Sequence, residues 1–521
     1  MDKIYNNFVK RILLFTFILT FFAGTLVYLK NNKQGFTSEI TAQNQNTDWP
    51  QFLHDAQNSG YQPNMTIRVN THTLTGGYGN PTWSFNPPES LVGHTVSTSN
   101  LLVVNSSVGK VYGLNPQTGA VLWSKDTGVR VSTSPAIANG KVIITNQLGQ
   151  VVALDQTNGN QLWVYATDWS VEVHPKVDNG TVYLGSGDGT FHAIDINTGS
   201  ARWKFRVGSA QDPGRTNAPI LTTAAILNGK VYFGAENMHV YALNTTNGAL
   251  LWARKVNGQS MAETSIVASS QNGGVVIART ILAYSFHITN LNPDGTFLFN
   301  IFGFGWEGSP MGTVDQLITE QKAITDRLVS NTHRRSMWEL DANTGNDKFS
   351  QPIAVLWTGG FGGAPAEPVV DDVTNRAWIT ARSVFARFDG GEMVRQYTDL
   401  LKLNLNFNPS VYTNTSLGQQ ALGLIHFPCF PTTRDDCKTS REDFHLIGDE
   451  GGIITATQNA VLYATWVSHG GVNLATGESF NIKYYNSSDD TEGLVNGRGA
   501  IVVANGNVLT QDSLGLNAYK Q

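Results

Sequence analysis

The chain has 521 residues, so its length alone would allow two or more domains. Charged residues make up 14% of it, against a usual ~25%, while glycine supplies 52 residues, an excess that suits strand-and-turn architectures. The formal net charge is −5 and no basic cluster occurs, which excludes a nucleic-acid-binding protein of the usual basic kind.

An apolar run near the N-terminus indicates export. Residues Ile12–Leu29 carry no charge over 18 positions, with Lys10 and Arg11 before them. The run is long enough to span a bilayer, so residues 1–29 are a signal-anchor or a cleaved signal peptide. We favour the anchor because no small-x-small cleavage site follows closely. Residues 30–47 are then a polar linker, and residues 48–521 lie outside the cytoplasm, either membrane-anchored in the periplasm or at the cell surface, or secreted after cleavage.

A ten-residue phrase recurs through the first half of the chain. In each copy an apolar residue precedes Asp or Asn, a Gly follows five positions after that apolar residue, and a Trp closes the phrase four positions later. The clear copies are Leu114–Trp123, Leu154–Trp163, Ile194–Trp203 and Leu243–Trp252. Successive Trp residues from Trp83 to Trp203 lie 40 positions apart. A period of about 40 residues with four short strands per unit is typical of a β-propeller blade.

One copy shows how a blade would form. Residues Gly180–Gly185, Gly189–Asp195 and Asn197–Trp203 hold β-branched and aromatic runs separated by Gly-containing turns, which predicts an antiparallel meander. We interpret the recurrent tryptophans as wedges between neighbouring blades, because a buried Trp removes roughly 150–250 Å² from water. A stacking platform for sugars or bases is the alternative. The wedges are Trp83, Trp123, Trp163, Trp203 and Trp252.

Weaker copies continue toward the C-terminus. Leu291–Gly295 ends in Phe299, Leu340–Gly345 in Phe349 and Leu474–Gly477 in Phe480, and Arg387–Gly391 lies near Tyr397. Together with the clear copies and Trp83, these give nine candidate phrase ends. The C-terminal runs Ala500–Ala504, Gly506–Leu509 and Leu516–Tyr519 lack an outer strand of their own. We therefore expect the strand around Trp83 to complete their blade and close the ring, which leaves no open sheet edge.

The phrase resembles the repeat of the pyrroloquinoline-quinone-type propeller family, Ala-x-Asp-x-x-Thr-Gly-x-x-x-Trp. Ala153–Trp163 and Ala193–Trp203 are close matches, and Asp48–Gly60 is similar to the segment that often precedes such repeats. The resemblance covers about residues 48–521 and is strongest over 80–255. It implies an all-β propeller of four-stranded blades, eight in number, closed by N- and C-terminal strands that share one blade.

The resemblance implies two classes of function. Some members are dehydrogenases of alcohols or sugars that hold pyrroloquinoline quinone and calcium on the ring axis, and others are non-catalytic, including assembly scaffolds of the bacterial outer membrane. The adjacent Cys-Cys pair and the Cys-x-x-Cys-His haem motif of many enzymes are absent. We therefore expect a membrane-anchored binding or scaffold module without catalytic residues, cofactor or metal. Its partners would be the membrane, and a protein or small molecule at the propeller face. A quinone-dependent dehydrogenase with bound calcium is the alternative.

Polar residues that vary between the copies form a candidate ligand site. Residues just before each innermost strand of a propeller converge at one mouth of the central channel, and variable polar groups on a rigid ring suit a binding surface. Such positions are Glu172, His174, Arg215, Asn217, Glu263 and Arg498. A carboxylate facing an Arg across the channel suits an acidic or sugar ligand. The alternative is that these are ordinary solvated loop residues, and none of them is identifiable as a general base.

The two cysteines and several sequons agree with export. Cys429 and Cys437 predict a disulfide outside the cytoplasm. A zinc site that adds His426 or His445 is the alternative, although the spacing matches no standard finger. Glycosylation-type sequons begin at Asn64, Asn105, Asn179, Asn244, Asn414 and Asn486.

Three further motifs are explained by the propeller itself. Gly303–Gly308 matches the dinucleotide pattern G-x-G-x-x-G but lacks the flanking strand and helix. Asp195–Gly199 and Asp341–Gly345 resemble calcium loops without the bidentate Glu of an EF-hand, and both fall on the repeat turn. Val314–Val329 has helical spacing, but alignment on the repeat predicts strands at Arg327–Asn331 and Ser336–Leu340 instead.

Overall fold

The computed structural model describes residues 47–69, 78–131, 133–208, 218–256, 260–262, 264–280, 337–349, 367–374, 376–382, 387–389, 392–395, 398–404, 425–426, 454–464, 468–475, 479–484, 500–512 and 515–521. All of them belong to the compact unit Thr47–Gln521. The predicted signal-anchor and the predicted disulfide Cys429–Cys437 lie outside these residues. Among the residues that the structure describes, no helix is long and apolar enough to cross a membrane.

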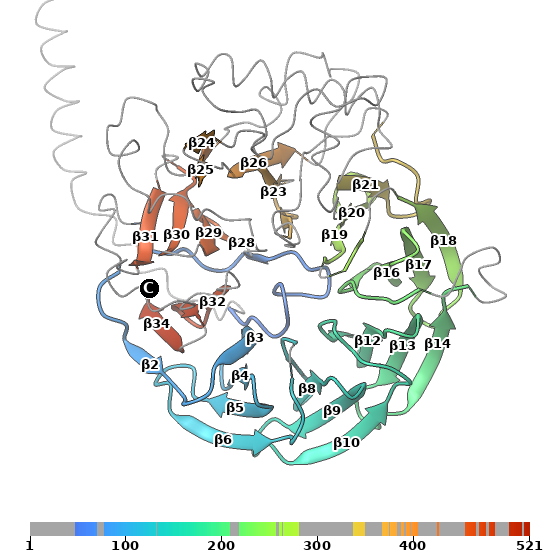
Figure 1. The fold of residues 1–521 in the computed structure, drawn as a ribbon, viewed down its shortest axis with the longest axis horizontal. Helices are drawn as coiled ribbons and strands as arrows, with labels where there is room; N and C mark the ends of the chain where they lie inside the picture. The colour runs from blue at the N-terminus through green and yellow to red at the C-terminus, as the bar shows by residue number, and fades with distance from the viewer. Residues whose placement is uncertain are drawn as a thin grey trace, which may run out of the picture. The chain divides into compact units, whose positions relative to one another are not determined.

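Four regular blades follow one another from residue 91 to residue 255, as the repeat predicts. Each is an antiparallel sheet whose strands run in chain order from the innermost to the outermost (Figure 1). Blade 1 holds β3 (Leu91–Ser97), β4 (Leu102–Ser106), β5 (Lys110–Leu114) and β6 (Val121–Asp126); blade 2 holds β7 (Ala136–Ala138), β8 (Lys141–Thr145), β9 (Gln150–Asp155) and β10 (Gln161–Ala166); blade 3 holds β11 (Lys176–Asp178), β12 (Thr181–Gly185), β13 (Thr190–Asp195) and β14 (Ala201–Arg206); blade 4 holds β15 (Ala225–Leu227), β16 (Lys230–Ala235), β17 (His239–Asn244) and β18 (Leu250–Lys255).

Local turn chemistry sets this meander. The first hairpin of blade 2 turns on Asn139 and Gly140, with φ of 50° and 74°, which is the geometry that Asn-Gly favours in two-residue hairpins. The last hairpin of blade 3 turns on the phrase, where Asp195 Oδ1 accepts the N–H of Asn197 at 2.9 Å and of Thr198 at 3.0 Å. The phrase is therefore the turn that places the outer strand.

The second half of the unit is less regular. The three-stranded sheet holds β19 (Val267–Ser269), β20 (Val275–Arg279) and β21 (Met337–Asp341), with a 3-10 helix, η1 (Gln271–Gly273), in its first hairpin; the β22 sheet holds β22 (Val369–Asp371), β23 (Arg376–Arg382), β26 (Thr398–Asn404) and β27 (Ile425–His426); the β28 sheet holds β28 (Ile454–Thr457), β29 (Ala460–Ala464), β30 (Ser468–Asn473) and β31 (Ser479–Tyr484), with β1 (Tyr61–Gln62) parallel to β28. A separate hairpin is formed by β24 (Arg387–Asp389) and β25 (Glu392–Arg395).

The N-terminal and C-terminal strands share one sheet, as predicted. This closing sheet has the order β2–β34–β33–β32, in which β2 is Trp83–Phe85, β32 is Ala500–Ala504, β33 is Asn507–Gln511 and β34 is Leu516–Lys520. Trp83 pairs with Ala518. The sequence predicts eight four-stranded blades, whereas the described residues form seven sheets of four or five strands and the three-stranded sheet β19–β21.

Two sequence assignments differ from the structure, and a third lies outside the described residues. The strand that pairs with β21 is β20, Val275–Arg279, whereas the repeat alignment gave that position to Arg327–Asn331, which lie outside the described residues. The weak phrase that ends at Phe299 also lies outside them, in the chain between β20 and β21. The weak phrase at Arg387–Gly391 lies between β23 and β26 of one sheet, where the β24–β25 hairpin forms. The alignment assumed a constant period, so it misplaced strands where a long insertion separates two strands that pair.

The phrase tryptophans lie between successive blades. Trp123 is 7% exposed and belongs to the apolar cluster that joins blade 1 to blade 2. Its Nε1 donates to the carbonyl of Gln156, in the phrase of the next blade, at 3.0 Å. Trp163 and Trp203 make the same bond to Ile196 at 2.9 Å and to Thr245 at 2.8 Å. Each indole thus joins one outer strand to the turn of the following blade.

Candidate functional site

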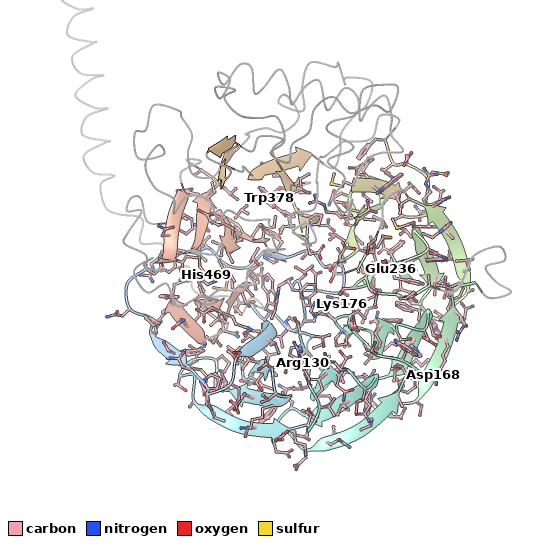
Figure 2. The ribbon with its side chains drawn as sticks, in the orientation of Figure 1. Arg130, Asp168, Lys176, Glu236, Trp378 and His469 are labelled. Carbon is pink, nitrogen blue, oxygen red and sulfur yellow. The ribbon has the colours of Figure 1, made fainter. Side chains whose placement is uncertain are left out.

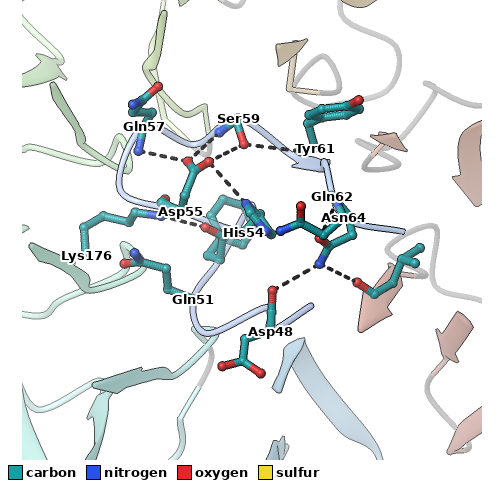
Figure 3. A network of polar contacts seen from close by, with 12 residues as sticks. Asp48, Gln51, His54, Asp55, Gln57, Ser59, Tyr61, Gln62, Asn64 and Lys176 are labelled. Atoms are coloured by element: carbon teal, nitrogen blue, oxygen red, sulfur yellow. Dashed lines mark hydrogen bonds and ion pairs between the residues drawn. The ribbon is translucent and has the colours of Figure 1, made fainter. Parts of the chain in front are cut away.

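A strap, residues Asp48–Gln62, contacts the innermost strand of each blade and of each later sheet in the ring (Figures 1 and 3). Trp49 pairs with Ser97 of β3, and strap carbonyls then accept N–H groups in ring order: Pro50 from Ile137 of β7 (2.7 Å), Ala56 from Ile226 of β15 (2.7 Å), Gln57 from Ala268 of β19 (2.9 Å), Ser59 from Val370 of β22 (2.7 Å) and Gly60 from Ala456 of β28 (3.0 Å). Strap side chains supply the two remaining contacts: Gln51 Oε1 accepts from Val177 of β11 at 2.9 Å, and Gln62 Nε2 donates to the carbonyl of Val503 in β32 at 3.2 Å. The strap therefore satisfies polar groups on the inner edges, which would otherwise be buried without partners.

Lys176 holds the strap at its most strained point. Leu53 and His54 have φ of 51° and 75°, a region that residues other than glycine rarely adopt. The Nζ of Lys176 donates to the carbonyl of Phe52 at 2.6 Å and to that of Asp55, on either side of this pair (Figure 3). The side chain of Lys176 is fully buried near the middle of the ring (Figure 2), and this burial lowers its pKa to about 7 against the opposing charge of Asp55.

Asp55 organises the second half of the strap. Its Oδ1 accepts the N–H of Gln57 at 3.0 Å and of Ser59 at 2.9 Å, while its Oδ2 accepts from the Ser59 hydroxyl and lies 3.2 Å from His54 Nδ1. Burial raises the pKa of Asp55, but the hydrogen bonds and charge of His54 and the bonds from Ser59 outweigh it, so this pKa lies below its usual value. The carboxylate thus works as a turn-forming acceptor.

Asn58 joins two sheets through the strap. Its side chain is fully buried, and Nδ2 donates to the carbonyl of Ala224 at 2.8 Å and to that of Ile266 at 2.7 Å. These carbonyls lie just before β15 and β19, so one amide group bridges blade 4 and the three-stranded sheet.

A belt of polar residues occupies one register position in six sheets of the ring, at its mouth. Five of them lie two residues before the first residue of an innermost strand, and the sixth holds the same register in β3; the belt is His94, Ser134, His174, Thr223, Ser265 and Glu367. The N–H of each belt residue in blades 1 to 3 donates to the belt side chain of the next blade, over 2.7 Å for His94 to Ser134 Oγ, 2.8 Å for Ser134 to His174 Nδ1 and 3.4 Å for His174 to Thr223 Oγ1. A β-bridge joins Thr223 to Ser265, and hydrogen bonding from Ser265 acts to lower the pKa of Glu367.

The belt gives His174 a structural contact that the sequence did not reveal. Because its Nδ1 accepts the Ser134 N–H, that nitrogen carries no proton and the neutral ring has its proton on Nε2. The imidazole also stacks on Phe52 of the strap, with centroids 3.7 Å apart and planes at 17°. His94 lies on the same aromatic ring at 5.0 Å.

Of the other predicted mouth residues, Glu172 lies within the described part of the chain. It is exposed, and its carboxylate accepts the hydroxyl of Ser170 at 3.2 Å. Arg215, Asn217, Glu263 and Arg498 lie outside the described residues, so their convergence stays a prediction. Among the sequons, Asn105 is fully buried and its Nδ2 donates to the carbonyl of Thr133 at 2.8 Å.

A buried charged group beside the mouth was missed from the sequence. Arg279 of β20, Glu339 of β21 and Glu367 before β22 are each less than 5% exposed. Burial raises the pKa of Glu367 to about 7, against the hydrogen bonds of Ser265 and the charge of Arg279. Burial lowers the pKa of Arg279 to about 10, against the charges of both glutamates. Charged residues inside otherwise apolar strands were the available signal.

The described belt residues do not supply the ligand set of a calcium ion. Calcium takes six to eight oxygen ligands, carboxylates prominent among them. The belt supplies one carboxyl group, that of Glu367, which is buried beside the charge of Arg279. Across the described ranges no group of three His, Cys, Asp or Glu side chains could hold a metal ion.

Comparison with known proteins agrees with the propeller. The profile of a family described as Outer membrane protein assembly factor BamB matches residues 73–279, which span blades 1 to 4. No curated protein matches the chain in sequence. The match covers the part of the chain in which the phrase is clearest.

Solved structures share the fold at low identity. Quinohemoprotein alcohol dehydrogenase from Comamonas testosteroni is 13% identical with a TM-score of 0.56, over 91% of this chain and 80% of that one. A europium-containing methanol dehydrogenase is 12% identical with a TM-score of 0.55, over 89% of each chain. BamB from Moraxella catarrhalis is 16% identical with a TM-score of 0.40, over 73% of this chain and 84% of that one. At these identities the likeness to the two dehydrogenases shows the fold alone.

Proposed function

We propose that this chain is an extracytoplasmic binding or assembly module. The premise is that it is a β-propeller of the pyrroloquinoline-quinone-type repeat family. One observation carries the proposal: the belt side chains at the mouth bond to neighbouring blades. Groups that hold the ring rigid are not free to ligate calcium or to move a substrate proton. The matching family profile, described as an assembly factor, supports the same class of function.

The test of this proposal is quinone binding. Full-length protein in detergent is titrated with pyrroloquinoline quinone and calcium by calorimetry, then offered ethanol or glucose with a redox dye. We expect no saturable heat and no dye reduction. Saturable quinone binding together with dye reduction would establish the alternative, a quinone-dependent dehydrogenase, and overturn the scaffold function.

We also propose that residues 12–29 hold the propeller at a membrane, outside the cytoplasm. The run is uncharged and long enough to span. A Leu19→Arg substitution places a charge near its centre, at a cost of roughly 2.5–3.5 kcal/mol. We expect this variant to leave the alkali-washed membrane fraction, while Ser38→Arg in the polar linker stays there. Equal retention of both variants would contradict the anchor.

We propose finally that the three-stranded sheet β19–β21 is the eighth blade. It lies between blade 4 and the β22 sheet, since β19 contacts both β15 and β22. Its third strand leads into the phrase Leu340–Gly345, as the third strand of each regular blade does. An experimental density map of this sector with no fourth strand beside β21 would contradict the count.

A further inference from the structure

Three exposed apolar side chains lie along one rim of blades 1 to 3. Val108 is 55% exposed, Leu148 is 66% exposed and Trp169 is 63% exposed. Val108 and Leu148 occupy the turns between the second and third strands of blades 1 and 2, and Trp169 lies in the connection from β10 to β11. In an antiparallel blade these turns and connections leave the sheet at the same end, so the three residues share one face. We call them the rim arc.

Hydrogen bonds link the turns and connections that carry the rim arc to one another. The Thr127 hydroxyl donates to the carbonyls of Gly109 and Val129, each at 2.8 Å, which ties the blade 1 turn to the connection after it. The Gln147 N–H donates to the carbonyl of Arg130 at 3.3 Å and carries the link to the blade 2 turn. The next connection repeats the pattern, because the Thr167 hydroxyl donates to the carbonyls of Gly149 and Trp169.

The exposed indole of Trp169 lies against a glycine of the neighbouring turn. The N–H of Gly187 in the blade 3 turn donates to the carbonyl of Ser170 at 3.1 Å. A Cβ on Gly187 would come 2.3 Å from Cδ1 of Trp169. The equivalent positions in blades 1 and 2 carry Ser107 and Gln147, and no positive φ requires glycine at 187. Gly187 therefore makes room for an indole that faces solvent.

The charges around the rim arc favour one kind of partner. Asp126, Asp168 and Glu172 are exposed in these connections and at the strand end before them, and Arg130 is an exposed cation among them. Asp188 of the blade 3 turn forms an ion pair with the exposed Arg206 at 3.2 Å, so the carboxylates of this group outnumber its cations. Exposed Trp on a rigid frame is typical of interface hot spots, and surrounding charge selects complementary partners.

We propose that the rim arc docks an apolar protein segment that carries lysine or arginine. The proposal rests on the binding function above and gives that function a surface and a partner chemistry. Because the backbone under the arc is already ordered, the propeller itself loses little conformational entropy when the segment binds.

The experiment uses full-length protein and three synthetic octapeptides that alternate Leu with Lys, Leu with Glu, and Ser with Lys. Binding is followed by fluorescence anisotropy of labelled peptide. We expect saturable binding of the Leu/Lys peptide and at least about tenfold weaker binding of the other two. Trp169→Ser and Leu148→Ser should each weaken Leu/Lys binding by about tenfold, a typical hot-spot effect. Leu122→Ser, which removes a leucine that is 52% exposed on the outer strand β6, should leave binding unchanged.

Three results would overturn the docking proposal. Equal losses in Leu122→Ser and Trp169→Ser, or equal binding of the Leu/Lys and Leu/Glu peptides, would overturn the proposal as non-specific adhesion. Concentration-dependent dimerisation in sedimentation that Trp169→Ser abolishes would assign the arc to a second copy of the chain, and would also overturn it. Failure of the binding function itself is detected separately, by quinone-dependent dye reduction.

Discussion

The α-carbon of Gly159 lies against the indole of Trp123, so closely that a Cβ at position 159 would come 2.6 Å from Cε3. The same contact is made by the glycine of each other clear phrase and by that of the phrase at Leu340–Gly345; the pairs are Gly119–Trp83, Gly199–Trp163, Gly248–Trp203 and Gly345–Trp252. The glycine of each of these phrases thus packs against the Trp on the outer strand of the preceding sheet in the ring. This explains why Gly and Trp recur together, although each Gly contacts the Trp of the neighbouring sheet and not the Trp of its own phrase.

The contact predicts an unequal response of two glycines in blade 2. Gly159 and Gly140 have nearly the same φ, 72° and 74°, but a Cβ on Gly140 meets nothing within 4 Å. Gly140→Ala should therefore lower the free energy of unfolding by about 1 kcal/mol through backbone strain alone. Gly159→Ala should cost about 1–3 kcal/mol more, because the indole must move. Urea unfolding measures both, and equal losses would show that the wedge yields freely.

A second comparison sets a partly buried tryptophan that packs between blades against an exposed one. Trp163 packs between blades 2 and 3 with its Nε1 bonded to Ile196, so Trp163→Ala should cost about 3–5 kcal/mol. Trp169→Ala removes an indole that faces solvent and should change the free energy of unfolding by less than about 1 kcal/mol. An unchanged melting temperature in Trp163→Ala would contradict the packing function of the phrase.

The periodic part of the fold was accessible from the sequence. A 40-residue period, a recurrent turn and a Trp were enough to place blades 1 to 4, because each blade packs only on its neighbours. Trp83 also predicted the closing strand correctly, since it keeps the same spacing. The period failed where long insertions separate paired strands, as between Arg279 and Met337 of β20 and β21.

The centre of the ring could not be predicted in this way. The strap bonds residue 49 to residue 97 and residue 62 to residue 503, and neither separation has a repeat behind it. Lys176 follows a proline and nothing in the neighbouring sequence distinguishes it, so only the fold shows that its Nζ faces strap carbonyls. The belt was partly accessible, because Ser134 and His174 lie at one register position that the repeat defines.

Lys176 predicts how stability depends on pH above neutrality. Its pKa is about 7 in the folded protein and near its ordinary 10.5 in the unfolded chain, so between these values only the unfolded state holds the proton. The free energy of unfolding should then rise with pH between about 7 and 10, by at most about 1.4 kcal/mol per pH unit. Lys176→Met should be less stable overall yet lose this rise. Parallel pH profiles of the two proteins would contradict a neutral Lys176.

Glu367 predicts the opposite slope in a lower window. Its pKa is raised from 4.5 to about 7 by burial, so between these values the folded state holds a proton that the unfolded chain has released. Stability should therefore fall as pH rises from about 4.5 to 7, by at most about 1.4 kcal/mol per pH unit. Glu367→Gln keeps the shape of the protonated carboxyl and its place beside Ser265, so its unfolding free energy should lack this fall. Urea titrations at pH 5, 6 and 7 measure the difference between the two proteins. A wild-type advantage that grows with pH would mean that Arg279 keeps the carboxylate ionised, and that burial does not dominate at this end of the belt.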